Sequence, residues 1–328
     1  MTLYPWQNDL YQQLTTTFLQ NHQHHALLFK TEKGLATDCL IRHFAHWLLC
    51  QNQQAGEPCY HCKSCLLVEH SNHPDFHILQ SVDNKEIGVD QIRELNTKLQ
   101  QFAQQDGNIV IYIADTDKLN ESSGNALLKT LEEPHKNVYF LLQTPLQSSI
   151  LATIQSRCQQ WVVYAPQPEE VLSWLNERYP NKTQDELNTA LRLCHHQPIS
   201  CKKFLENDRL TQRKAFLQTF WRFYKSKNPL LLFSQFDKEK EDVLEQLDWL
   251  SSFFSDALKA RMNIATHWVN ADLQKGIILF AEALHSEKLL NGHKIVQQTQ
   301  QDLIHINAVN QELILMDCLT KLVLNVFE

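Results

Sequence analysis

The stretch of sequence that decides the fold runs from Asn125 to Pro134 and reads NALLKTLEEP. Its apolar residues recur at helical spacing and form one stripe: Ala126, Leu127, Leu128 and Leu131. Pro134 ends the pattern, because proline lacks the backbone N–H that a helix interior needs. We therefore predict a short amphipathic helix here, with Asn125 and Lys129 on one side of it.

Apolar runs rich in β-branched residues lie on both sides of this predicted helix. Residues 108–114 read NIVIYIA and residues 138–142 read VYFLL, a pattern typical of buried parallel strands. A similar run at 25–29 and helical patterns at 38–50 and 89–102 continue the alternation. The economical fold is an α/β domain with a parallel sheet and helices on both faces.

The alternation stops at Pro166 and Pro168, and the patterns beyond them are helical. We predict three parts: an α/β domain at 1–165 with a cysteine-rich module at 50–65, a small helical domain at 166–205, and an all-α domain at 206–328. The presence of only 7 glycines and 10 prolines favours a helix-rich chain with short connections. The last helix, expected at 311–327, is apolar on most sides, which predicts burial in its own bundle or against another subunit.

Charge and composition disfavour several classes of protein. The formal net charge is −7 and no block of Lys or Arg occurs, so we expect any contact with DNA to be shared with partners. No apolar run reaches the roughly 18 residues that span a bilayer. Met1 to Trp6 lacks the pattern of a secretory signal, and we therefore expect a cytoplasmic protein with no membrane partner.

Four of the nine cysteines have the spacing of metal ligands. Cys50, Cys59, Cys62 and Cys65 follow the pattern C-x8-C-x2-C-x2-C. A CxxC turn lets two thiolates reach one tetrahedral ion, and four thiolates complete a structural zinc site. An iron–sulfur cluster and free thiols are the alternatives. Nearby histidines offer substitute ligands: His61, His70, His73 and His77.

A segment in the position of a phosphate-binding loop lies between the apolar run at 25–29 and the next helical pattern. Of the motif GxxxxGK[ST], only Gly34 is present. Ala36 replaces the second glycine, Thr37 the lysine, and Asp38 the magnesium-binding hydroxyl. An aspartate at that position would repel a triphosphate, so the residues alone favour an ordinary strand-to-helix turn.

Five motifs, taken in order, resemble the clamp-loader subunits of bacterial DNA polymerase III, which belong to the AAA+ family. They are Tyr4-Pro5-Trp6, the four cysteines, GVDQIR at 88–93, NALLKTLEEP at 125–134, and Ser156-Arg157-Cys158. The resemblance covers most of the chain. It implies an AAA+ P-loop-type domain with a zinc knuckle, a small helical lid and a helical collar that serves oligomerisation.

The resemblance also implies which residues carry the chemistry. In an active relative, the strand at 109–113 would be followed by a magnesium carboxylate and a catalytic glutamate, whereas this chain has Ala114 and Asp115. Arg157, supported by Ser156, matches the arginine finger that such subunits lend to the ATP site of a neighbour. We therefore expect structural zinc as the cofactor, no bound ATP and no intrinsic catalysis.

The partners implied by the resemblance are the motor (tau/gamma) subunits and the delta subunit in a hetero-pentamer. Through that ring the chain would help to load the sliding clamp on primed DNA, as an accessory subunit of a DNA-directed DNA polymerase.

The resemblance bears on two further segments. Cys194-His195-His196 stands where active relatives carry a nucleotide sensor. The helix that starts near Asp90 either faces DNA or is merely solvated, and solvation is the favoured interpretation.

Two rival functions follow from the same motifs. The first is an active AAA+ clamp-loader ATPase, which the missing lysine and magnesium carboxylate disfavour. The second is a zinc-dependent DNA-binding protein, which the acidic balance disfavours. We predict a non-hydrolysing stator of the clamp loader in DNA replication.

Overall fold

The computed structural model describes residues 3–20, 22–54, 56–82, 85–99, 103–105, 107–306 and 310–328. The chain divides into two compact units, Met1–Glu170 and Val171–Glu328. The first unit has two large hydrophobic core clusters and a small cluster of cysteines, and the second unit has one large cluster. Among the described residues, no helix combines the length and the apolar character needed to cross a membrane.

A five-stranded parallel sheet forms the centre of the first unit. Its strands are β1 (Ala26–Thr31), β2 (Phe76–Leu79), β3 (Ile109–Ile113), β4 (Val138–Pro145) and β5 (Gln159–Val163). They lie in the order β2-β3-β4-β1-β5, and every neighbouring pair is parallel. The apolar runs at 25–29, 108–114 and 138–142 are therefore strands of one sheet, as predicted.

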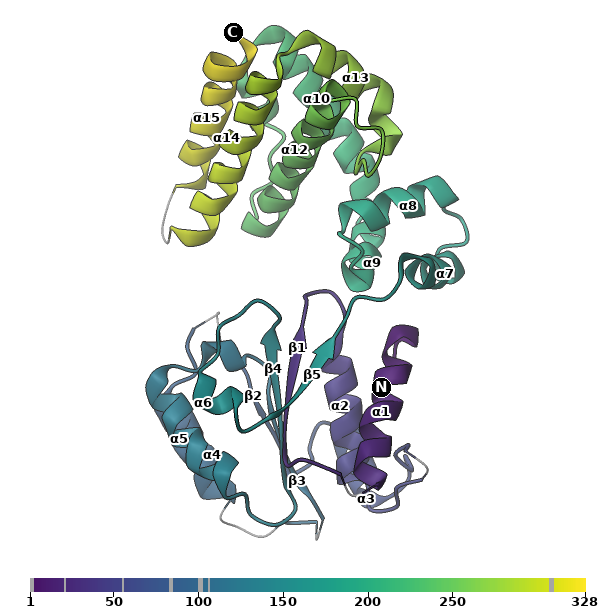
Figure 1. The fold of residues 1–328 in the computed structure, drawn as a ribbon, viewed down its shortest axis with the longest axis vertical. Helices are drawn as coiled ribbons and strands as arrows, with labels where there is room; N and C mark the ends of the chain where they lie inside the picture. The colour runs from purple at the N-terminus through teal and green to yellow at the C-terminus, as the bar shows by residue number, and fades with distance from the viewer. Residues whose placement is uncertain are drawn as a thin grey trace. The chain divides into compact units, whose positions relative to one another are not determined.

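Helices cover both faces of this sheet, as Figure 1 shows. In β1, Leu27 and Phe29 pack with α1 (Asn8–Leu19) and α2 (Thr37–Leu49). Ala26 and Leu28 point to the other face, because successive strand residues alternate, and pack with α4 (Val89–Leu99) and α5 (Glu121–Glu132). The predicted α/β fold class is thereby confirmed.

Helix α5 contains most of the NALLKTLEEP stretch but begins earlier than predicted. Its first residue is Glu121, because the side chain of Asn120 accepts a hydrogen bond from the Ser123 N–H at 2.9 Å and caps the helix. Gly124 lies inside the helix where a Cβ atom would approach Leu151 Cδ1 to 2.3 Å. Any larger residue here would require the Leu151 side chain to move.

The remaining elements of the first unit differ from the prediction or are short. Strand β2 was not predicted, because it is an edge strand whose residues are only partly buried. The helix predicted at 89–102 is α4, which ends at Leu99, and residues 100–102 lie outside the described part of the chain. Short helices complete the unit: η1 (Pro5–Gln7), α3 (Lys63–Glu69), η2 (Thr116–Lys118) and α6 (Ala152–Gln155).

The second unit is entirely helical in its described residues. Its elements are α7 (Pro168–Arg178, which begins just before the unit boundary), α8 (Gln184–Leu193), α9 (Pro198–Glu206), α10 (Arg209–Ser226), α11 (Pro229–Phe233), α12 (Lys240–Arg261), η3 (Ala271–Leu273), α13 (Gln274–Ala283), α14 (Ser286–His305), α15 (Gln311–Leu322) and η4 (Val323–Phe327). Their buried residues form one cluster that runs from Val171 to Phe327. The predicted division at residues 205 and 206 stays a prediction.

The C-terminal helix is less buried than its sequence suggests. The helix predicted at 311–327 is α15, followed by a short π-helical turn at Val323–Phe327. Leu315, Leu319 and Leu322 are buried, whereas Leu313 is 68% exposed and Leu324 is 57% exposed. The expectation of burial therefore holds for one face of the helix only.

Candidate functional site

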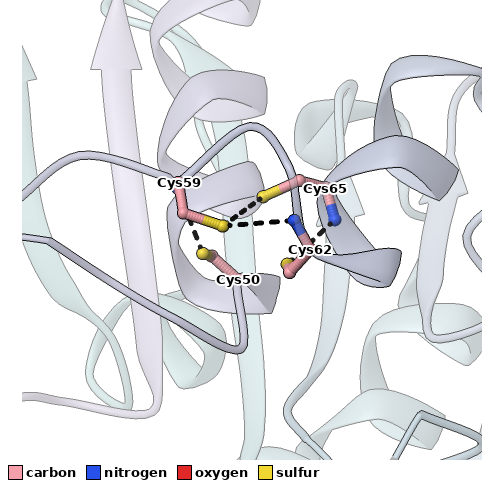
Figure 2. Close-up of side chains that lie close together, drawn as sticks. All are labelled: Cys50, Cys59, Cys62 and Cys65. Carbon is pink, nitrogen blue, oxygen red and sulfur yellow. Dashed lines mark hydrogen bonds between the residues drawn. The ribbon is translucent and has the colours of Figure 1, made fainter.

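The four predicted metal ligands come together at the end of α2. Cys50 directly follows the helix, Cys59 lies in the next loop, and Cys62 is the N-cap of α3, which contains Cys65. Their sulfur atoms all lie within 4.8 Å of one another (Figure 2). Successive backbone N–H groups point at the sulfurs: Cys59 N donates to Cys50 Sγ at 3.3 Å and Cys62 N to Cys59 Sγ at 3.3 Å.

The cluster fits a tetrahedral metal ion. The Sγ atoms of Cys59 and Cys65 are 3.8 Å apart. Zinc–sulfur bonds of about 2.3 Å in a tetrahedron place the sulfurs roughly 3.8 Å from one another. Among the described residues this is the only group of three or more potential ligand side chains close enough to hold an ion, and it includes none of the candidate histidines.

The thiols of the cluster differ in acidity. Burial raises the pKa of Cys50 and of Cys65 above the usual range of a thiol. Burial acts in the same direction on Cys59, but hydrogen bonds from the N–H groups of His61 and Cys62 outweigh it and lower the pKa of Cys59 to about 6. A bound divalent cation would favour the thiolate at all four positions.

The loop before Cys59 is held by α1. Gly56 has a φ of 93°, in the left-handed region, and a Cβ atom there would lie 3.1 Å from Thr15 Oγ1. The hydroxyl of Tyr11 donates a hydrogen bond to the Gly56 carbonyl at 2.7 Å. These contacts connect the cysteine-rich module to the core of the first unit.

The segment predicted as a degenerate phosphate loop joins β1 to α2, and the N-terminal segment makes hydrogen bonds to it. Trp6 Nε1 donates to the Leu35 carbonyl at 3.0 Å, and Gln7 Nε2 donates to the carbonyls of Leu35 at 3.0 Å and Ala36 at 2.7 Å. Ala36 has a φ of 55°, which turns the chain into α2. The loop therefore has internal protein partners for two of its backbone carbonyls.

The side chains that replace the phosphate ligands do not supply positive charge. Thr37, in the lysine position, is 4% exposed, and its Oγ1 lies 2.5 Å from Thr31 Oγ1. Asp38 occupies the first turn of α2, where a carboxylate rather than a phosphate meets the helix N-terminus. Gly34, with a φ of 78°, is the one glycine in this loop.

The two residues after β3, Ala114 and Asp115, make hydrogen bonds within the protein. Ala114 has no side-chain oxygen for a metal, and its N–H donates to the Leu79 carbonyl at 2.8 Å. The carboxylate of Asp115 accepts a hydrogen bond from the Ser81 N–H at 2.8 Å. Both positions follow the carboxyl end of a parallel strand, at the same sheet edge as the degenerate loop.

Arg157 lies at the other end of the parallel strands, before the amino end of β5. It connects α6 to the first residue of β5, whose partner β1 runs parallel to it. Ser156 is the C-cap of α6, and its hydroxyl donates to the Thr153 carbonyl at 3.2 Å. Burial raises the pKa of the Cys158 thiol to about 12, and this side chain packs on the core. The neighbours of Arg157 thus fix the backbone while 32% of its side chain remains exposed.

Arg157 has a partner that the motifs do not reveal. Its guanidinium forms an ion pair with Glu132, the last residue of α5, and Nε donates to Glu132 Oε1 at 2.7 Å. Glu132 belongs to the NALLKTLEEP stretch, but its pairing spans 25 positions of sequence. Gln7 was missed for a similar reason, because its partner Ala36 is 29 positions away.

Comparison with known proteins covers the whole chain. The family model described as DNA polymerase III, delta subunit matches residues 6–166, and the model described as DNA polymerase III, delta subunit, C terminal matches residues 207–323. The chain is 43% identical over 326 residues to the DNA polymerase III subunit delta' of Haemophilus influenzae, covering 99% of this chain and 98% of that protein. It is 31% identical over 323 residues to the subunit delta' of Escherichia coli strain K12, covering 98% and 96%.

Among solved structures, a DNA polymerase III gamma subunit-related protein from Thermotoga maritima is similar at a TM-score of 0.45 and 15% identity. That comparison covers 95% of this chain and 99% of the other.

Proposed function

Because this chain belongs to the delta-prime family of DNA polymerase III subunits, we propose that it is the non-hydrolysing stator of a clamp loader. The family places it in DNA replication, as an accessory subunit of the polymerase. We propose further that it works in the cytoplasm, in a hetero-pentamer with the motor (tau/gamma) and delta subunits. The ring would open the sliding clamp and place it on primed DNA.

The proposal that the chain does not hydrolyse ATP is supported by its degenerate loop. No lysine stands where the phosphates would need one, and Thr37 in that position is neutral and buried. Asp38 adds a negative charge at the helix N-terminus. These features leave a triphosphate without its main partners and with one repulsive neighbour.

The role of Arg157 as an arginine finger rests on its place in the sheet. The degenerate loop follows the carboxyl end of β1, whereas Arg157 precedes the amino end of the parallel strand β5. An arginine at that edge does not serve the loop of its own chain. Its side chain is 32% exposed, and in a ring its guanidinium would stabilise the charge that develops on the γ-phosphate of ATP held by a neighbouring subunit.

Zinc has a structural part in this proposal. Cys50, Cys59, Cys62 and Cys65 would hold it, and four thiolates leave no open coordination position for a substrate. The ion would fix the turn between α2 and α3. No step of ATP hydrolysis depends on it.

The proposed function is tested by Arg157→Ala in a reconstituted clamp loader. The variant should assemble normally and keep its zinc, because an exposed side chain contributes little to packing. ATP turnover stimulated by clamp and DNA should fall, with a loss at the shared site that approaches about 10³-fold. Arg157→Lys should restore little, because an ammonium lacks the planar fork of a guanidinium.

Three results would contradict the proposal. Normal turnover in a fully assembled Arg157→Ala complex would remove the arginine finger. Micromolar affinity of the isolated chain for ATP, measured by calorimetry, would favour an active ATPase instead. Tight binding of primed DNA by the isolated chain would favour the zinc-dependent DNA-binding protein.

A further inference from the structure

The guanidinium of Arg157 is held between two helices. On one side, Nε and Nη2 both donate to Oε1 of Glu132, at the end of α5. On the other side, Nη1 donates to the Thr153 carbonyl of α6 at 2.8 Å. The plane of the guanidinium is therefore set by two independent elements of the first unit.

This arrangement leaves donors for a phosphate. A guanidinium carries five N–H groups, of which Glu132 receives two and Thr153 receives one. One N–H of Nη2 remains after these contacts. Nη1 also donates to the Ser156 hydroxyl at 3.4 Å, a long hydrogen bond that a phosphate oxygen could replace. The terminal nitrogens form the edge that pairs with two phosphate oxygens, and the side chain is 32% exposed.

The contact with Glu132 restricts a side chain that would otherwise be mobile. An arginine on an exposed turn has many rotamers, and fixing it at the moment of reaction costs conformational entropy. A finger that is already oriented avoids that cost in the transition state. Most exposed ion pairs add little to stability, so the value of this pair lies in orientation rather than in folding.

We propose that Glu132 is a positioning residue for the finger, holding Arg157 ready for the γ-phosphate bound by the neighbouring subunit. This inference rests on the proposed function of Arg157. The adjacent Glu133 offers a matched control. It is also exposed and has the same charge, but its side chain makes no hydrogen bond or ion pair with the described residues.

The test is a double-mutant cycle in the reconstituted clamp loader. Glu132→Gln, Arg157→Ala, the double variant and Glu133→Gln are compared by kcat and KM for ATP with clamp and primed DNA present. Glu132→Gln should lower kcat by at least about half of the Arg157→Ala loss on a logarithmic scale, with KM unchanged. The double variant should be no slower than Arg157→Ala, and Glu133→Gln should match the wild type.

Each other outcome has a distinct meaning. If Arg157→Ala turns over normally, the finger itself is wrong, whatever Glu132 does. If Arg157→Ala is slow but Glu132→Gln matches the wild type, the finger stands and the positioning role is wrong. A Glu132→Gln variant faster than the wild type would make Glu132 a brake. An extra loss in the double variant, or poor assembly of Glu132→Gln, would assign Glu132 to the fold.

Discussion

The side-chain amide of Gln7 donates a hydrogen bond to the backbone carbonyl of Ala36 at 2.7 Å, across 29 positions of sequence. Gln7 is 1% exposed, and the same amide also reaches the Leu35 carbonyl at 3.0 Å. One residue of η1 thus binds the loop that in an active relative would surround the phosphates. The loop is held by the chain's own N-terminal segment.

Replacing Gln7 should loosen this loop without creating a nucleotide site. Gln7→Ala removes two hydrogen bonds made by a buried side chain, so the free energy of unfolding should fall by about 1–3 kcal/mol in urea denaturation. ATP should still fail to bind at tenth-millimolar concentration in calorimetry, because the phosphate-binding lysine is absent. Gln13→Ala, at an exposed position of α1, is the control and should leave stability unchanged. Tight ATP binding by Gln7→Ala would mean that Gln7 alone excludes the nucleotide.

The cysteine cluster should hold one zinc ion per chain. Cys62→Ser should lose that ion, because it removes one of four ligands from a site that has no spare donor among the described residues. Elemental analysis after metal-free purification measures the zinc content. Cys39→Ser, a thiol outside the cluster, is the control and should keep a full equivalent. A visible charge-transfer band in the wild type would indicate an iron–sulfur cluster instead.

His46 should make the protein sensitive to acid. Burial, followed by the nearby His43, lowers the pKa of His46 to about 4, and its Nε2 has no hydrogen-bond partner among the described residues. An unfolded histidine has a pKa of about 6.5. Between these values the unfolded chain binds the extra proton. Stability is therefore complete above pH 6.5 and falls toward pH 4, by up to about 1.4 kcal/mol per pH unit.

Unfolding in urea at a series of pH values measures this dependence. His46→Gln should flatten the slope of stability against pH below 6.5, because glutamine does not titrate. The exposed His22→Gln should keep the slope of the wild type. Equal slopes in the wild type and His46→Gln would show that other groups cause the acid sensitivity.

Gly292 should tolerate no side chain. A Cβ atom there would lie 2.5 Å from Cε1 of Phe254, which is fully buried against α14. Gly292→Ala should lower the free energy of unfolding by about 1–3 kcal/mol, although alanine favours helix formation. Gly276→Ala is the matched control: nothing lies within 4 Å of its Cβ, and the variant should be neutral or more stable. Thermal unfolding compares the two, and a stabilised Gly292→Ala would mean that Phe254 moves aside freely.

The sequence predicted the elements whose patterns are strong and local. Strands β3 and β4 are continuous apolar runs, and α5 has a clear stripe that ends before Pro134. Strand β2 was missed because an edge strand needs only partial burial and has no such run. Inside the helical domain predicted at 166–205, Pro198 is the first residue of α9, where proline's missing N–H costs nothing.

The site was predictable where spacing sets the geometry. The four cysteines lie within sixteen residues, and their spacing alone correctly predicted that their side chains form one cluster. The roles of Gln7 and Glu132 depend on contacts across 29 and 25 positions. The residue type gives no signal for either role, because Gln and Glu are common in helices and are usually exposed. Only the folded arrangement identifies their partners.

The order of strands in the sheet has a consequence for how the chain folds during synthesis. Strand β1 is made early but lies between β4 and β5, which end at Pro145 and Val163. The nascent sheet therefore stays incomplete, with unpaired strand edges, until residue 163 has left the ribosome. The four cysteines lie between residues 50 and 65, so all the ligands of the proposed zinc site are synthesised long before β4 and β5 pair with β1.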